Sequence, residues 1–135
     1  MSEREILFRG KIIELCKYQG QWLEGFFGSD NGKTFITIQN ENGLNGYFCD
    51  SKTVGQYTGL KDKNGTRVFE GDIIDVAYNP NYGGVAKERI GTFKVGFEDG
   101  CYVYEDGEGY FLFTESDEIV VIGNIHDNPE LLKGE

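Results

Sequence analysis

Apolar and polar residues alternate along several short stretches of this chain, and turn-forming pairs separate these stretches. Residues 34–38 and 93–97 show the alternation, which is typical of a strand with one solvated face. Asn and Asp tolerate a positive φ and Gly adopts it without steric cost, so the pairs suit type I′ turns between antiparallel strands. The pairs are Asn31-Gly32, Asn42-Gly43, Asn45-Gly46, Asn64-Gly65, Asp99-Gly100 and Asp106-Gly107.

The stretches between these pairs predict a mostly-β, compact antiparallel fold with little helix. The predicted strands span residues 10–18, 22–28, 34–39, 46–49, 66–69, 73–78, 89–97, 102–105, 110–113 and 119–122. Turns about 8–12 residues apart favour a barrel-like arrangement or a sandwich. A helix start occurs only near the end, where Asn128 can cap and Pro129 can take the first position of a short turn. We expect a single domain over residues 1–135, with a soft internal division near residues 49–54.

Composition and charge restrict the functional classes. The 135 residues include 1 Trp, 8 Tyr and 10 Phe, enough for a core without disulfides or metal. A net charge of −10 argues against binding to nucleic-acid phosphates or to anionic membranes. Three widely spaced cysteines, with neither a secretory signal nor a long apolar segment, favour reduced thiols and a cytoplasmic location.

Two local patterns resemble functional motifs but favour structural interpretations. Residues 28–34 resemble a phosphate-binding loop, yet three residues instead of four separate the glycines, and a strand pattern follows. A hairpin turn is the better interpretation. His126 is the single histidine, and a capping or surface contact near the final turn is favoured over catalysis.

Neither the carboxylates nor the single Trp indicates a specific catalytic or binding function. Glycosidase-type pairs or a magnesium site are alternatives, but no spacing among the carboxylates specifies them, and acidic β-turns commonly solvate a strand-rich surface. Trp22 suits core or hairpin packing better than a binding platform. We therefore predict no catalytic residue, metal or cofactor, and a protein that is not an enzyme. The carboxylates are Glu70, Asp72, Asp75, Glu98, Asp99, Glu105, Asp106 and Glu108.

The most distinctive segment covers residues 54–74. Two bends, Asn64-Gly65 and Gly71-Asp72, enclose a short predicted strand and precede a longer one. A glycine-acid pair before the first long strand is the opening pattern of an SH3-like barrel, so we predict an SH3-like C-terminal half. Its candidate interaction or structural residues are Tyr57, Thr58, Gly59, Lys61, Asp62, Lys63, Gly65, Arg67, Glu70, Gly71 and Asp72.

Residues 53–74 closely resemble the signature of the YopX family of phage and prophage proteins. Residues 4–11, residues 121–132 and Trp22-Leu23-Glu24-Gly25 are also similar to that family, whereas residues 12–19 and 79–88 depart from it. The resemblance implies a small β-rich, phage-encoded cytosolic protein that forms a homo-oligomer. It implies no catalytic residues.

Three functional hypotheses remain open at this stage. The first is a non-enzymatic binding or regulatory module that acts on a host or phage protein, with nucleic-acid mimicry by the acidic surface as a variant. The second is an oligomeric binder of a nucleotide-type small molecule, with Lys61, Lys63, Arg67 or Arg89 facing the ligand. The third is a hydrolase that uses a close carboxylate pair.

Overall fold

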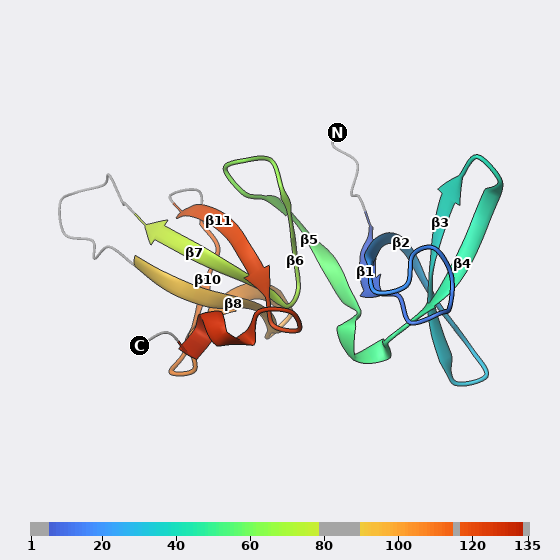
Figure 1. Ribbon diagram of the computed structural model, residues 1–135. Helices are drawn as coiled ribbons and strands as arrows, with labels where there is room; N and C mark the ends of the chain where they lie inside the picture. The colour runs from blue at the N-terminus through green and yellow to red at the C-terminus, as the bar shows by residue number, and fades with distance from the viewer. Residues whose placement is uncertain (1–5, 79–89, 115–116, 134–135) are drawn as a thin grey trace. The chain divides into compact units, whose positions relative to one another are not determined.

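The chain forms eleven strands and two short 3₁₀ helices within residues 6–78, 90–114 and 117–133, which the computed structural model describes (Figure 1). Two compact units divide it, Met1–Gly59 and Leu60–Glu135. The elements are β1 (Phe8–Lys11), β2 (Trp22–Asp30), β3 (Lys33–Asn40), β4 (Gly43–Cys49), η1 (Ser51–Thr53), β5 (Gly55–Lys61), β6 (Arg67–Phe69), β7 (Asp72–Tyr78), β8 (Ile90–Glu98), β9 (Cys101–Glu105), β10 (Tyr110–Leu112), β11 (Asp117–Asn124) and η2 (Pro129–Lys133).

The N-terminal unit is an antiparallel sheet whose strands lie in the order β4-β3-β2-β1-β5. Its buried centre is Ile12, Ile36 and Cys49. On the opposite side of β3, the ring of Phe35 occupies the space above Gly28 and Gly46, where a Cβ atom would lie 2.8 Å and 3.0 Å from the ring. Glycine inside these strands therefore lets an aromatic ring span three strands.

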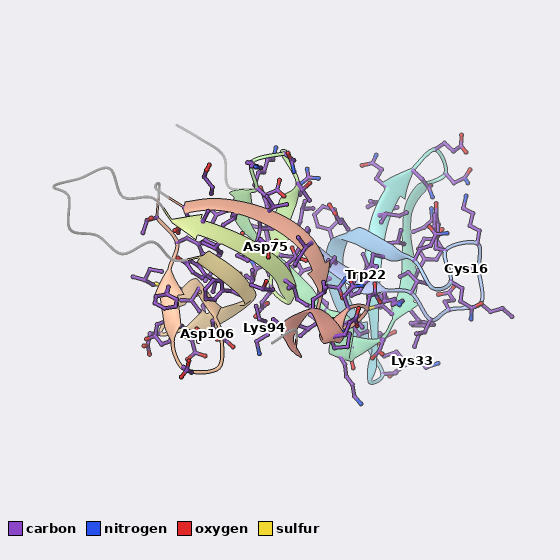
Figure 2. All side chains as sticks on the ribbon, turned by 60° about the vertical axis from the view of Figure 1, so that its left-hand side comes forward. Cys16, Trp22, Lys33, Asp75, Lys94 and Asp106 are labelled. Carbon is purple, nitrogen blue, oxygen red and sulfur yellow. The ribbon has the colours of Figure 1, made fainter. Side chains whose placement is uncertain are left out.

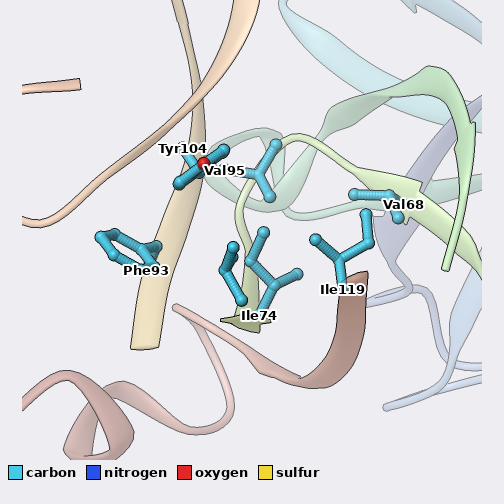
Figure 3. Close-up of a cluster of buried hydrophobic side chains, with 7 residues drawn as sticks. Val68, Ile74, Phe93, Val95, Tyr104 and Ile119 are labelled. Carbon is cyan, nitrogen blue, oxygen red and sulfur yellow. The ribbon is translucent and has the colours of Figure 1, made fainter. Parts of the chain in front are cut away.

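In the C-terminal unit, β7 to β10 form a meander and β11 returns to pair with β7, giving the order β10-β9-β8-β7-β11. Alternate residues of these strands supply one face of the core (Figure 3). Phe93 and Tyr104 meet edge to face, with ring centroids 5.0 Å apart, a favourable aromatic geometry. The buried cluster is Val68, Ile74, Val76, Phe93, Val95, Tyr104 and Ile119.

The predicted mostly-β, antiparallel fold class is confirmed. Asn31 and Gly32 have φ values of 50° and 77°, and Asp99 and Gly100 have 50° and 82°, so both pairs form the predicted hairpin turns. Within the described residues the strand orders have open ends, so no closed barrel forms there. Turn spacing predicts the lengths of strands but does not specify which edges pair. The SH3-like assignment of the C-terminal half stays a prediction.

Several predicted boundaries differ from the structure. Strand β1 ends at Lys11, and residues 14–20 form bends and turns instead of continuing the predicted strand. Strand β5 was not predicted, because Gly55 and Gly59 lowered its strand signal. The pair Asn45-Gly46 lies inside β4 instead of at a turn, since Asn45 and Gly46 pair with Ile38 and Thr37.

The division into units falls between Gly59 and Leu60, whereas the sequence places a soft division near residues 49–54. Residues 79–88, predicted as a variable loop, lie outside the described residues.

The predicted short C-terminal turn is present as η2, with Pro129 at its first position. Asn128, predicted to cap this turn, instead makes a contact to the preceding residues. Its side-chain Oδ1 accepts a hydrogen bond from the backbone N–H of Asn124 at 3.2 Å, and a Cβ atom on Gly123 would lie 2.6 Å from that oxygen. The side chain therefore holds the preceding turn against the end of β11.

Candidate functional site

The predicted motif forms a tight turn around a buried carboxylate, here called the Asp62 turn (residues 61–66). The backbone N–H of Asp62 donates to the carbonyl of Thr66 at 2.8 Å, and the N–H of Gly65 donates to the carbonyl of Asp62 at 2.9 Å. Gly65 has a φ of 84°, a conformation that Gly adopts without strain. Gly therefore occupies the position of the turn that requires a positive φ.

Three backbone N–H groups converge on the Asp62 carboxylate. Oδ1 accepts from Asn64 and from Thr66, each at 2.9 Å. Oδ2 accepts from Val121 at 2.9 Å, across a sequence separation of 59 residues. Burial acts to raise the pKa of this side chain, but the three N–H donors and the positive charge of Lys63 outweigh burial and lower the pKa below its ordinary value of 3.8. Asp62 is therefore ionised at neutral pH.

The Asp62 turn also covers the outer edge of β11. The backbone N–H of Lys63 donates to the carbonyl of Ile119 at 3.1 Å, beside the bond between Val121 and Asp62. Where β11 begins, the N–H of Asp117 donates to the carbonyl of Thr114 at 3.1 Å. These bonds satisfy backbone groups that an edge strand would otherwise leave open to pair with another chain.

The second bend of the motif, Gly71-Asp72, is buried. Oδ2 of Asp72 accepts from the backbone N–H of Phe69 at 2.7 Å. The N–H of Gly71 donates to the carbonyl of Val95, and its own carbonyl accepts from the N–H of Ile125, each at 2.9 Å. Gly71 has a φ of 90°. This bend joins β6, β8 and the turn after β11, so its role is structural.

A cleft of about 600 Å³ is lined by residues of the Asp62 turn and by described residues just after β10 and at the start of β11. Lys61 and Lys63, which are both exposed, line the cleft, and so do Asp117 and Glu118. Asp117 is engaged already, because Oδ1 accepts from the hydroxyl of Tyr104 at 3.2 Å and Oδ2 from the N–H of Thr114 at 2.8 Å. The remaining lining residues are Leu60, Asp62, Phe113, Thr114 and Ile119.

The structure separates the candidate residues predicted from the sequence. Tyr57, Thr58 and Gly59 belong to β5 in the N-terminal unit. Lys61, Asp62 and Lys63 line the cleft, whereas Gly65 shapes the turn, and Arg67, Glu70, Gly71 and Asp72 follow it without lining the cleft. The sequence gives no sign that Phe113, Thr114, Asp117, Glu118 and Ile119 line the same cleft as the Asp62 turn, because no local pattern indicates contacts between residues so far apart in the chain.

The other sequence candidates lie apart from the cleft. His126 is exposed, and its backbone N–H donates to Oδ1 of Asn124 at 3.0 Å in the turn after β11. Trp22 is half-buried and its ring lies 4.9 Å from the guanidinium carbon of Arg9. Residues 28–34 form the hairpin between β2 and β3.

All three cysteines lie among the described residues. Cys16, Cys49 and Cys101 are free thiols. Burial, together with the charge of Asp50, raises the pKa of Cys49. In the part of the chain that the structure describes, no three His, Cys, Asp or Glu side chains lie together in a way that would hold a metal ion. The same residues contain no helix of the length and apolar character needed to cross a membrane.

The fold and this site define a two-unit antiparallel β protein in which a buried carboxylate turn covers a sheet edge. Comparison with protein families gives a match to the YopX protein family over residues 8–133, and the chain belongs to that family. The crystal structure of protein EF1440 from Enterococcus faecalis is 27% identical, with a TM-score of 0.54, and the match covers 96% of this chain and 99% of that one. A search of curated proteins found no match.

Proposed function

We propose that this protein is a non-enzymatic binding or regulatory module, encoded by a phage or prophage, that acts in the bacterial cytoplasm on a basic protein partner. The observation that carries the proposal is the uneven distribution of charge between the two units. Residues 1–59 hold six basic and seven acidic residues, a net of −1, whereas residues 60–135 hold seven basic and sixteen acidic residues, a net of −9.

Many acidic side chains of the C-terminal unit are exposed, so they are available to a partner. Two of these exposed residues, Asp75 and Asp106, are labelled in Figure 2. A surface of one sign raises the association rate with an oppositely charged partner, and salt weakens this effect. The exposed acidic residues in the described part are Asp75, Glu98, Asp99, Asp106, Glu108, Glu118, Asp127 and Glu130.

The buried carboxylates of the motif support a binding module over a hydrolase. A general acid needs a pKa raised toward the working pH. Asp62 has a lowered pKa and its oxygens accept three backbone N–H bonds. Asp72 likewise binds a backbone N–H. Both side chains hold the backbone in place.

Capture from bacterial lysate tests the proposal when variants of equal net charge are compared. The C-terminal triple variant carries Glu98→Gln, Glu108→Gln and Glu130→Gln, and the N-terminal triple variant carries Glu24→Gln, Asp30→Asn and Glu41→Gln. All six side chains are exposed, and both variants have a net charge of −7, three units above the −10 of the natural chain. We expect a basic protein to be retained at roughly 0.05 M salt by the natural chain and the N-terminal variant, and released at roughly 0.5 M.

A net charge of −10 also predicts that nucleic acids are not the partner. We expect no mobility shift of mixed-sequence duplex DNA, single-stranded DNA or RNA at about 0.15 M salt, because phosphate contacts supply most non-specific affinity. Lys61, Lys63 and Arg67 are the densest basic cluster in the sequence. Binding that is tight, and that is lost when these three residues are changed to Ala, would contradict this prediction.

Self-association is part of the proposal as well. The family resemblance favours a homo-oligomer, and closed homo-oligomers are common among proteins of this size. Because the C-terminal units would repel one another, we expect the near-neutral N-terminal unit to form the contact. Light scattering at micromolar concentration is expected to give a multiple of 15.2 kDa. A mass equal to that of one chain would contradict self-association.

A further inference from the structure

We infer that the outer edge of β4 pairs with the same edge of a second copy of this chain, with the two-fold axis at Asn45. The inference rests on the self-association proposed above and names the surface that carries it. Strand β4 stands at one end of the N-terminal sheet and pairs with β3 in a continuous register from Gly43 to Cys49. Its outer side is engaged near the end of the strand, where Ile12 forms an isolated bridge with Cys49.

Strand β4 lacks the features that protect the other sheet ends in the described part of the chain. Natural edge strands avoid pairing with other chains through short length, charged residues, proline, bulges or a covering loop. Strands β6 and β10 have 3 residues each, and the Asp62 turn covers β11. Strand β4 has 7 residues, none of them charged and none a proline, and its register with β3 shows no bulge. An added strand is therefore least opposed at β4.

The backbone groups of Leu44 and Gly46 point away from β3. Phe48 shows this direction, because its N–H donates to Oε1 of Glu14 at 2.9 Å and its carbonyl accepts from the N–H of Ile13 at 2.9 Å. In an antiparallel strand, residues that direct both backbone groups to one side alternate with residues that direct them to the other. Leu44, Gly46 and Phe48 occupy alternate positions of β4, so the N–H and carbonyl groups of Leu44 and Gly46 face outward as well.

Bonds already made near both ends of β4 select one register for the second copy. With the axis at Asn45, Leu44 of each copy exchanges both backbone hydrogen bonds with Gly46 of the other. An axis at Gly46 would set Leu44 opposite Phe48, whose backbone groups are already bonded. An axis at Leu44 would set Gly46 opposite Asn42, whose N–H already donates to a side-chain oxygen. The register centred on Asn45 is therefore the one that uses the open groups of both copies.

Side chains and charge on this edge also suit a second copy. Leu44 is 64% exposed, and in this register it lies opposite Gly46 of the second copy, beside the Phe35 ring that covers Gly46. The contact between leucine and ring occurs twice, because a two-fold interface uses the same surface of both copies. Strand β4 carries no charge and belongs to the near-neutral N-terminal unit, so two copies meet here without strong repulsion.

Light scattering of variants at Leu44 tests the pairing. Leu44→Pro removes an outward N–H and leaves the bonds to β3 in place, and Leu44→Lys puts a charge on the edge. We expect the mass of the natural chain at micromolar concentration, a multiple of 15.2 kDa, to fall by about half or more in both variants. Leu112→Lys makes the same change at a 56% exposed leucine of β10 and is expected to keep the natural mass. Circular dichroism checks that each variant folds.

A cysteine at the axis tests the register. In the proposed pairing the two Asn45 residues form a non-hydrogen-bonded pair with Cα atoms about 4.5 Å apart, a separation that a disulfide can bridge. We expect Asn45→Cys to give a covalent dimer under mild oxidation. The control Gln39→Cys, at an exposed position of β3, is expected to give no more covalent dimer than the natural chain with its exposed Cys101.

Three results would overturn the inference. An oligomer whose mass is the same in both Leu44 variants would place the contact elsewhere and leave self-association standing. A natural chain that is monomeric would exclude the second copy and self-association together, and loss of a captured lysate protein by Leu44→Lys would then assign the edge to a different protein. Failure of Asn45→Cys to form the covalent dimer would contradict the register. Capture of the basic partner depends on the C-terminal unit, so that proposal stands or fails separately.

Discussion

Replacing Asp62 by Ala is expected to destabilise the C-terminal unit by about 3–5 kcal/mol. The substitution removes the acceptor of three backbone N–H groups and releases the Asp62 turn from the edge of β11. Hydrogen bonds to a charged acceptor contribute about 1.5–3 kcal/mol each, and because these three bonds are only part-buried, water replaces part of what is lost. Urea denaturation followed by far-UV circular dichroism measures the loss. A variant as stable as the natural chain would contradict the structural role of this carboxylate.

The same side chain predicts a specific acid sensitivity. Because the folded pKa of Asp62 is lowered below 3.8, its contribution to stability is present above that value and is lost as pH falls through the folded pKa. Asp62→Asn keeps one acceptor but cannot titrate. The stability gap between the natural chain and this variant is therefore expected to be constant from about pH 5 to 7 and to narrow below about pH 4. A gap that does not change with pH would contradict the pKa assignment.

Replacing Gly71 by Val is expected to cost about 3 kcal/mol, because Val is β-branched and Gly71 has a φ of 90°. Both backbone groups of Gly71 are hydrogen-bonded and the residue is buried, so the bend has no freedom to relax. Gly65→Val has the same conformational problem at a φ of 84° but meets no atom within 4 Å. We expect a smaller loss there, about 1–2 kcal/mol.

The control for these two variants is Gly109→Val. Gly109 has no positive φ and a Cβ atom there meets nothing within 4 Å, so its thermal melt is expected to match that of the natural chain. If all three glycine variants melt together with the natural chain, the positive φ values at the two bends of the motif are wrong.

Local chemistry explains which parts of the fold were predictable. The pairs Asn31-Gly32 and Asp99-Gly100 were identified as turns because their positive φ values depend on the two residues themselves. Asn45-Gly46 has the same composition but lies within β4, since pairing with β3 outweighs its turn preference. Strand β5 lacked a local signal because its glycines obscured it.

The candidate site depends even more strongly on contacts between residues far apart in the sequence, which local patterns do not predict. The turn pattern of residues 54–74 indicates Lys61, Asp62 and Lys63 as candidate residues. Nothing near Asp62 in the sequence indicates that its carboxylate binds the N–H of Val121, because that contact depends on how β11 returns to β7. The cleft can therefore be identified only in the folded chain, in which the Asp62 turn lies beside residues of β11.

The charges are a property of the sequence, but their unequal division can be recognised only from the boundary between the two units at Gly59 and Leu60. With that boundary, nearly all of the net charge belongs to one unit. A partner that responds to net charge alone would treat the two triple variants alike, since both carry −7. A partner that binds the acidic C-terminal unit would distinguish them.

Calorimetric titration of the captured partner against the two triple variants tests most directly whether the acidic C-terminal unit binds a basic protein, as we propose. Three exposed charges at an interface contribute on the order of 1.5 kcal/mol together, which corresponds to about tenfold in Kd. We expect a Kd about tenfold weaker for the C-terminal triple variant and a nearly unchanged Kd for the N-terminal triple variant. Equal Kd values for the two variants, whether both weakened or both unchanged, would contradict it.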